Sequence, residues 1–267
     1  HVAGFCHDVH LVTVLGAPDS YEDFVRSHLK PNITPHIIVR PDAPTIVKRR
    51  FVDPFLISKM FEVCYLNETY LPPALQSDLR AHLQAVIADY DVVLVTDFGH
   101  GMLDRDTIAL LTQTARFLAV NTQANSLNLG YNVISNYPRA DYVCIDQEEL
   151  RLAARDRLTP VPELIPEIAA QVDAAAVNVT LGTHGSLSYR RAQGMTAVPV
   201  FTSEVVDSIG AGDAYLAITA PCVAAGFAAD LIGFIGNCVG ALAVQIVGNK
   251  ESVEPTALFK FITTLLK

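Results

Sequence analysis

Four short runs of apolar residues recur along the chain, and each is followed by a segment whose apolar residues have helical spacing. The runs are residues 92–95, 117–120, 142–145 and 176–179. Continuous apolar runs of this length are typical of strands buried on both faces, as in parallel sheets covered by helices. The alternation therefore predicts an α/β fold, a three-layer αβα sandwich with a mostly parallel sheet.

Two other parts of the chain have different patterns. The last third has helical patterns over 213–226, 230–247 and 255–266. Residues 33–70 contain three short apolar runs between Pro- and Asp-rich turns, at 37–39, 45–47 and 60–63. Such spacing predicts antiparallel strands. We expect a small β lid or edge sheet there, within a single domain over 1–267.

Residues 205–217 read VVDSIGAGDAYLA, so a strand-like segment meets a glycine turn and then an apolar helical pattern. Glycines let backbone N–H groups converge, and a helix N-terminus adds partial positive charge. Gly210, Ala211 and Gly212 therefore predict an anion site. A carboxylate at Asp213 would repel a phosphate, unless it accepts the proton of a hydroxyl that attacks that phosphate. The combination favours phosphoryl transfer.

A plain helix cap is the alternative interpretation of this stretch. Asp207 or Asp213 would then accept hydrogen bonds from helix N–H groups, and the glycines would serve only the turn. Other phosphate-binding motifs are absent from the sequence. It contains no GxxxxGK[ST] loop, and the residues after Gly212 do not complete a GxGxxG fingerprint.

Residues 207–213, DSIGAGD, closely resemble the D-T-x-G-A-G-D signature of the ribokinase-like, PfkB-type carbohydrate kinases, with Ser in place of Thr. The resemblance implies transfer of the γ-phosphoryl group of ATP to a sugar hydroxyl. It implies that Asp213 is the catalytic base, and that the amides of Gly210, Ala211 and Gly212 hold the transferred group. Asp207 is assigned to the ATP site by the same resemblance.

Two more stretches resemble nucleotide-binding parts of this family. Residues 179–185, VTLGTHG, are similar to its T-x-G-x-x-G loop, which implies that Thr180, Gly182 and Gly185 contact ATP. An ordinary hairpin turn is the alternative. Asn237 and the Gly- and Ala-rich residues after it resemble the helix beside the adenine. A core helix whose small residues permit close packing is the alternative there.

Asp146 and Glu149 stand where the family carries N-x-x-E, a motif tied to the placement of Mg²⁺ and phosphate. Asp146 replaces the Asn and adds negative charge near the metal. A solvated first turn of a helix is the alternative, because carboxylates favour that position. Residues 248–250, GNK, resemble the loop that closes the nucleotide pocket, in some members with a monovalent cation.

Residues 95–103, VTDFGHGML, resemble the S-D-Y-G-K-G-x-L segment of the family. Asp97 ends a predicted buried strand, the place where open α/β sheets bind ligands. His100 stands where Lys is common, so a cationic role there would depend on pH. A histidine in a surface loop is the alternative.

Residues 42–50, DAPTIVKRR, together with 58–62, SKMFE, resemble the heptose-phosphate kinase branch of the family. This implies that Lys48, Arg50 and Lys59 border a phosphorylated sugar, since such side chains pair with phosphate oxygens. An ordinary strand with solvated charges is the alternative. Residues 53–57 depart from the pattern of the branch, which leaves the identity of the sugar open.

The resemblance covers nearly the whole chain but begins just after the Gly-Gly element of the family. The first strand, an early sugar-contacting Asp and that Gly-Gly pair have no counterpart here. The sugar site would then be incomplete and the sheet would lack a central strand. A shortened chain, a missing part located elsewhere, and a degenerate kinase that binds nucleotide without turnover are the three explanations.

Composition excludes several other classes of protein. The formal net charge is −9, and the longest basic block is residues 48–50, which disfavours nucleic-acid binding. Five scattered cysteines without a CxxC pair predict reduced thiols in a cytoplasmic protein. The apolar stretches near 214–229 and 231–247 contain Gly, Pro or Asn and predict core helices rather than membrane spans. No signal peptide is visible.

Two alternatives to a sugar kinase stay open. One is a non-catalytic nucleotide-binding module, such as the kinase-like half of a larger protein. The other is a nucleoside kinase, which would keep the site and change the phosphoryl acceptor. The resemblance also implies a homodimer contact through the lid at 33–70.

Overall fold

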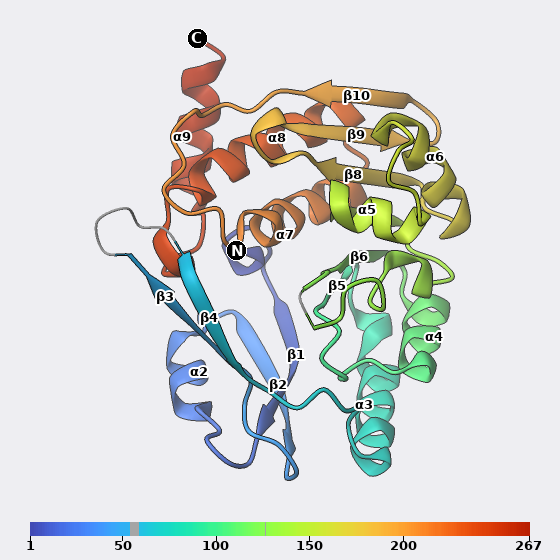
Figure 1. The fold of residues 1–267 in the computed structure, drawn as a ribbon, viewed down its shortest axis with the longest axis vertical. Coiled ribbons are helices and arrows are strands. Elements are labelled where there is room, and N and C mark those ends of the chain that lie inside the picture. Colours follow the sequence, from blue (N-terminus) through green and yellow to red (C-terminus); the bar gives the residue numbers. More distant parts are fainter. Residues whose placement is uncertain (54–58, 126) are drawn as a thin grey trace.

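The computed structural model describes residues 1–53, 59–125 and 127–267, and Figure 1 shows the arrangement of its elements. A six-stranded sheet has the order β10-β9-β8-β7-β6-β5. The strands from β5 to β8 are parallel, whereas the β8–β9 and β9–β10 pairs are antiparallel. Their bounds are β5 Val93–Asp97, β6 Leu118–Thr122, β7 Tyr142–Asp146, β8 Ala176–Thr180, β9 Ser186–Arg190 and β10 Gly194–Val198. The predicted α/β architecture with a mostly parallel sheet is confirmed.

Helices cover both faces of this sheet, because side chains alternate along each strand. On β7, Val143 and Ile145 belong to the core beneath α4, α5 and α6. Tyr142 and Cys144 belong to a second core, beneath α7 and α8. The two groups of helices lie on different sides in Figure 1. Their bounds are α4 Arg105–Thr114, α5 Gln147–Ala154, α6 Val161–Gln171, α7 Ala211–Ala224 and α8 Ala229–Ala243.

A second, two-stranded sheet joins β1 (Val9–Gly16) to β2 (Ile33–Arg40) in parallel. The prediction of an antiparallel lid strand over 37–39 is therefore wrong. Helix α2 (Glu22–His28) connects the two strands, and a crossover of this kind places them in parallel. Helix α3 (Pro73–Val86) packs on this pair, where its buried Leu79 shares a small core with Ile38.

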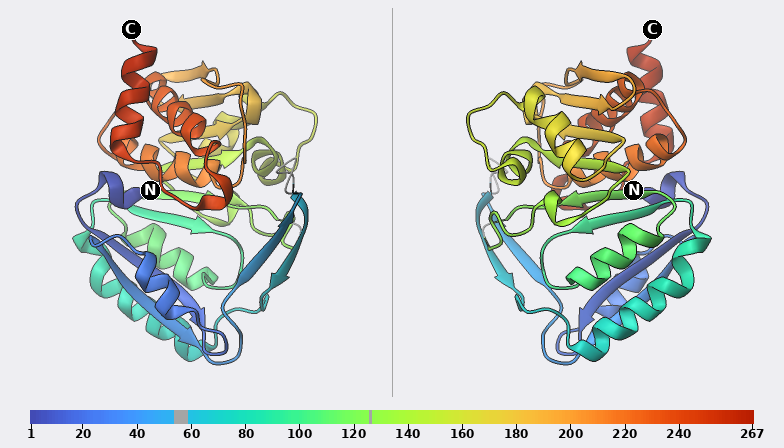
Figure 2. Two further views of the ribbon diagram at one scale, coloured as in Figure 1. Left: turned by 90° about the vertical axis from the view of Figure 1, so that its left-hand side faces the viewer. Right: turned by 90° about the vertical axis from the view of Figure 1, so that its right-hand side faces the viewer.

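The lid consists of β3 (Val47–Val52) and β4 (Lys59–Tyr65), which form an antiparallel pair. Figure 2 shows this pair standing at one side of the molecule. Antiparallel strands were predicted here and are confirmed, although the lid is smaller than 33–70. The departure from the heptose-phosphate kinase pattern covers residues 53–57, of which 54–57 lie outside the described residues. Ser58 of the SKMFE stretch also lies outside them.

The remaining elements are short helices and turns, with one longer helix at the end of the chain. They are α1 Val2–Phe5, η1 Ile87–Asp89, η2 Ile134–Asn136, η3 Gly182–His184, η4 Val247–Asn249 and α9 Pro255–Leu265. Along the parts of the chain that the structure describes, no helix combines the length and apolar character needed to cross a bilayer.

The sheet is interrupted between β5 and β1. The six-stranded sheet ends at β5, and β1 belongs to the separate pair with β2. A cavity of about 250 Å³ lies between them, lined by residues 11–16 of β1 and by Thr96 and Asp97 at the end of β5. Six consecutive residues of one strand can line a cavity only if its backbone edge faces the space. This interruption agrees with the expected absence of a central strand.

Helices α7 and α8 pack closely at a position where α8 has a glycine. A Cβ atom at Gly236 of α8 would overlap the ring of Tyr215 on α7. The Tyr215 ring is fixed in turn, because its hydroxyl donates to Ser186 Oγ at 3.1 Å and accepts from Asn178 Nδ2 at 2.8 Å. Since Tyr215 lies two residues after Asp213, this contact also sets the position of the start of α7.

We expect Gly236→Ala to lower the free energy of unfolding by about 1–3 kcal/mol, because overpacking forces the Tyr215 ring or the helix to shift. Gly240→Ala is the matched control on the same helix, where an added Cβ would meet nothing within 4 Å. It should leave stability unchanged or raise it by about 0.4–1 kcal/mol. Urea unfolding followed by circular dichroism measures both, and equal effects would contradict the packing argument.

Candidate active site

The start of α7 leaves backbone amides available. Gly210 precedes the helix with φ 78° and ψ 0°, a left-handed conformation, and a Cβ there would overlap the side chain of Asn249. The amide of Ala211 donates to the carbonyl oxygen of Ser208 at 3.3 Å. Within the described residues, the amides of Gly210 and Gly212 have no such acceptor. Gly212 also borders open space, so this helix tip can receive an anion.

Asp207 shapes the turn before α7. Its Oδ1 accepts from the amide of Ile209 at 3.0 Å, and its Oδ2 accepts from the amide of Gly248 at 2.8 Å. Both carboxylate oxygens therefore accept hydrogen bonds from backbone amides. These bonds connect this turn to the loop at 247–249. The capping interpretation does not fit Asp207, because α7 has no side-chain cap and the carboxylate accepts only from residues outside that helix.

Asp213 is half-buried in the first turn of α7. Burial raises the pKa of its carboxyl group, and the Lys48 ammonium opposes that rise. Lys48 comes from β3 of the lid, so the lid reaches across the sheet edge to the start of α7. A carboxylate with a raised pKa is a stronger base than a solvated one, as a general base near neutral pH requires.

Glu149 is buried at the start of α5, which rejects the solvated-turn interpretation for this residue. Its Oε2 accepts from the amide of Asp146 at 2.9 Å, while Asp146 Oδ1 accepts from the amide of Glu149 at 2.8 Å. The amide of Ala124 donates to Glu149 Oε1 at 3.0 Å. The pair forms a capping box, in which Asp146 stays exposed.

The carboxyl groups at this edge of the sheet act on one another. Burial, followed by the charge of Asp146, raises the pKa of Glu149 to about 7, and Asp213 adds to the rise. Buried carboxylates without a compensating cation are unfavourable. This donor set therefore suits a divalent cation. Among the described residues no group of three such side chains could hold a metal ion.

The predicted nucleotide loop lies beside Asp146, because Asp146 and Thr180 are partners in the β7–β8 register. Thr180 in turn faces Ser186 across an antiparallel hairpin, so the hairpin description of the backbone is confirmed. Gly185 has φ 90°, and a Cβ there would overlap the carbonyl oxygen of Val198. Gly182 is exposed and borders open space.

Asn237 is buried on α8 and serves the backbone nearby. Its Nδ2 donates to the carbonyl oxygens of Val198 at 2.9 Å and Pro199 at 3.0 Å. The amide thus ties α8 to the chain leaving β10, next to the Gly185 turn. Asn237 is thus brought into one region with Thr180, Gly182 and Gly185, although it is far from them in sequence.

Asp97 is buried and fully engaged. Its Oδ1 accepts from the amide of Gly99 at 2.9 Å, and its Oδ2 accepts from the hydroxyl of Tyr137 at 2.8 Å. The carboxylate therefore organises the loop after β5. Tyr137 had no sequence signal, because the contact joins residues 40 positions apart.

The three basic candidates of the lid separate into two groups. The Lys48 ammonium lies 5.4 Å from the centre of the Phe98 ring, on the side of the cavity. Arg50 Nε lies 2.6 Å from Glu62 Oε2, and Lys59 Nζ lies 3.5 Å from the same atom. Lys48 is thus the candidate that approaches Asp213, whereas Arg50 and Lys59 pair with an acid of their own sheet.

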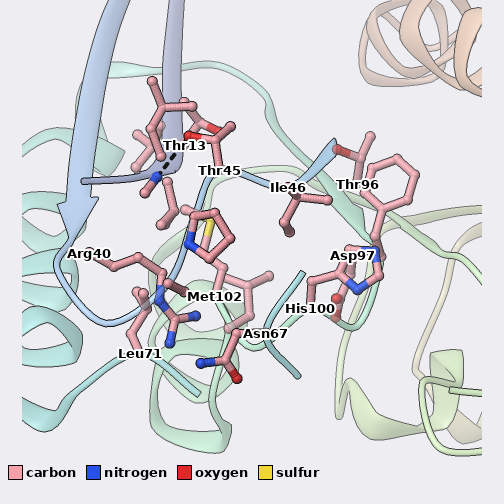
Figure 3. A pocket seen from close by; sticks show the side chains of 18 of the residues that line it. Thr13, Arg40, Thr45, Ile46, Asn67, Leu71, Thr96, Asp97, His100 and Met102 are labelled. Atoms are coloured by element: carbon pink, nitrogen blue, oxygen red, sulfur yellow. Dashed lines mark hydrogen bonds between the residues drawn. The ribbon is translucent and has the colours of Figure 1, made fainter. Parts of the chain in front are cut away.

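Figure 3 shows the cavity between β1 and β5, with side chains from distant segments around it. Sequence reasoning missed Arg40 and Asn67 among its lining residues, and gave His100 no place in it. Only the FGHG resemblance drew attention to His100. Arg40 is buried in a bidentate pair with Asp42, at 3.0 and 2.7 Å, so it serves mainly to hold the chain after β2.

Comparisons with known proteins agree with this geometry. A bifunctional protein HldE from Rhodopseudomonas palustris is 26% identical over 228 residues, 84% of this chain and 46% of that protein. The chain thus spans about half the length of the curated relatives it matches. Phosphofructokinase-2 from Escherichia coli, in complex with potassium, has a TM-score of 0.79 at 14% identity, covering 100% of this chain and 85% of its own.

Ribokinase from Thermotoga maritima has a TM-score of 0.74 at 16% identity, covering 95% of this chain and 81% of its own. At these identities the two structures establish the ribokinase-like fold. The family description "pfkB family carbohydrate kinase" matches residues 2–257, nearly the whole sequence. The chain therefore belongs to the pfkB family of carbohydrate kinases.

Proposed function

We propose that this protein transfers the γ-phosphoryl group of ATP to a hydroxyl group of a sugar or sugar phosphate. The observation that carries the proposal is the tip of α7. There, backbone amides without an acceptor among the described residues lie within one helical turn of the half-buried Asp213 carboxylate. An anion site and a base so close together suit an alcohol that loses its proton beside a phosphoryl group.

In the proposed reaction the acceptor O–H bond breaks, and its proton passes to the Asp213 carboxylate. The acceptor oxygen forms a bond to the γ-phosphorus, and the bond from that phosphorus to the bridging oxygen breaks, with its electrons leaving on ADP. The amides of Gly210 and Gly212 stabilise the charge on the transferred group. Ala211 contributes its amide once the bond to Ser208 gives way.

The ATP site is assigned to the residues gathered around the Gly185 turn. Thr180, Gly182 and Gly185 present backbone to the phosphates, and Asn237 and Asp207 hold the neighbouring segments in place. Glu149, with Asp146 beside it, would hold Mg²⁺, which neutralises charge on the β- and γ-phosphate oxygens when bound. A monovalent cation at the 248–250 loop stays a prediction.

The phosphoryl acceptor is assigned to the space between Asp213 and the lid. Lys48 supplies the cation nearest to Asp213, and we propose that it pairs with an anionic group of a phosphorylated sugar. Arg50 and Lys59 would need to leave Glu62 to do so. Asp97 positions the loop after β5, because its oxygens accept hydrogen bonds from Gly99 and Tyr137.

Asp213→Asn tests the whole assignment. We expect kcat to fall about 10²- to 10⁴-fold, because the amide cannot accept the proton, while folding and ATP binding persist. In the unaltered protein kcat should also fall as pH drops through the raised pKa of Asp213. A coupled assay of ADP release across a panel of sugars, sugar phosphates and nucleosides measures this. Near-normal turnover by the variant would reject the base, and turnover of nucleosides alone would favour a nucleoside kinase.

Lys48→Met should raise the KM for a phosphorylated acceptor about tenfold to a hundredfold and leave the KM for ATP unchanged, since a charged contact is lost. Arg49→Met is the matched control, because alternation places Arg49 on the opposite face of the same strand. Equal effects of the two variants in the same assay would assign Lys48 to lid stability instead.

We further propose that two copies of the chain meet through the outer face of the lid. Phe51 and Phe61 are paired across β3 and β4, their rings stack at 4.4 Å, and they are 41% and 51% exposed. Exposed aromatic pairs on a small sheet mark interaction surfaces. The opposite face, with Lys48 and Arg50, is left free for the site.

Phe61→Ser should shift the protein from a pair of 28.9 kDa chains to single chains, because the stacked pair is lost. Phe24→Ser, on the exposed side of α2, is the control and should not change the mass. Light scattering coupled to gel filtration gives the result. A single-chain mass for the unaltered protein at micromolar concentration would refute the dimer.

A further inference from the structure

The cavity between β1 and β5 contains a histidine that the proposed reaction does not use. The cavity is lined on one side by residues 11–16, and on the other by the end of β5 and the loop after it, including His100. Figure 3 shows His100 at the same end as Asp97 and Thr96. Any role of His100 towards an acceptor rests on the proposed kinase function, because that reaction is what requires an acceptor near the cavity.

Several polar groups around the cavity already have partners within the protein. Asp97 accepts from Gly99 and Tyr137. Arg40 pairs with Asp42 and also donates to Thr69. The Thr45 hydroxyl donates to the carbonyl oxygen of Ser20 at 2.8 Å and accepts from the amide of Gly16 at 2.9 Å. These groups hold the cavity walls and have little capacity left for a ligand.

His100 differs from them. Its Nε2 atom is buried, and no hydrogen-bond partner for it exists among the described residues. Buried polar atoms in folded proteins are satisfied in the great majority of cases, because an unsatisfied one costs about 1–3 kcal/mol. A buried, unpartnered nitrogen on a residue that lines a cavity therefore points to a partner that the ligand supplies.

The charge state of His100 narrows the chemistry of that partner. Burial lowers the pKa of its imidazole, and the Lys48 ammonium lowers it further, against the opposing charges of Asp97 and Glu68. The ring is therefore neutral at neutral pH. A neutral imidazole makes an ordinary hydrogen bond and does not neutralise an anion, so it suits a hydroxyl group better than a phosphate.

His100 and Asp213 share one charged neighbour. The Lys48 ammonium acts on the pKa of both His100 and Asp213. Lys48 lies over the ring of Phe98, and Phe98 stands two residues before His100 in the same loop. A ligand that reaches from His100 towards Asp213 would pass beside Lys48, so one molecule can meet a neutral donor, a cation and a base.

We propose that His100 is a specificity-determining residue, whose Nε2 forms a hydrogen bond with a non-reacting hydroxyl group of the phosphoryl acceptor. Acceptors that carry a hydroxyl at that place are bound, and deoxy analogues leave the nitrogen unpaired and are rejected. Lys48 holds the anionic part of the acceptor, if there is one. In this proposal His100 selects acceptors by their hydroxyl group, and Lys48 selects acceptors by their negative charge.

The test compares His100→Ala and His100→Gln with the unaltered protein, and uses His28→Ala on the exposed end of α2 as the control. Because His100 Nε2 has no partner among the described residues, the substitutions remove no hydrogen bond made by that atom and should leave thermal stability nearly unchanged. The probes are fructose-6-phosphate, ribose, adenosine and a heptose phosphate. The coupled assay of ADP release gives the KM for each probe and for ATP.

For every probe that the unaltered protein phosphorylates, His100→Ala should raise the KM about tenfold or more and change the KM for ATP less than about twofold. His100→Gln should recover part of the loss, since its amide is also a neutral donor. An acceptor KM unaltered in His100→Ala, or an equal rise in the KM for ATP, would overturn the assignment.

If no probe causes ADP release, the proposed kinase function fails, but the proposed role of His100 in binding can still be tested. Calorimetric titration of the same sugars into the unaltered protein and into His100→Ala then tests whether His100 contributes to binding. Binding that His100→Ala weakens about tenfold supports the hydroxyl contact without turnover. Equal binding to both proteins, or binding to neither, overturns it.

Discussion

The accumulation of carboxylates at one edge of the sheet is the constraint on which the rest of this structure depends. Asp146, Glu149 and Asp213 lie at the starts of α5 and α7, and the charges of Asp146 and Asp213 both raise the pKa of Glu149. Burial raises the pKa of both Glu149 and Asp213. The same edge supplies the amides of Gly210 and Gly212, which have no acceptor among the described residues, and the cation of Lys48.

The strand order explains why these groups meet. Parallel strands direct their carboxyl ends to one edge, and the helix after each strand begins there with its N–H groups exposed. Asp146 ends β7 and Thr180 ends β8, and the register places them side by side. Two cores on opposite faces of the sheet keep α5 and α7 in position, and Tyr215 packs tightly beneath Gly236.

The two faces of the lid carry different kinds of side chain. One face carries Lys48 towards Asp213 and the cavity, and the other carries the stacked pair of Phe51 and Phe61. A two-stranded sheet has little stability of its own, so packing on both faces stabilises it. If the proposed acceptor and the proposed second copy pack on its two faces, assembly of the site would be coupled to dimerisation.

The sequence by itself determined the sheet and the helix tip, because both depend on local patterns. Apolar runs predicted the strands, and DSIGAGD predicted the Gly210 turn and the base. Neither the parallel pairing of 33–40 with β1 nor the contact of Lys48 with the surroundings of Asp213 could be predicted, since each joins segments far apart in sequence. Tertiary structure also decided that Asp97 and Asp207 hold backbone, and that His100 faces a cavity without a partner among the described residues, because burial and hydrogen bonding exist only once the chain has packed.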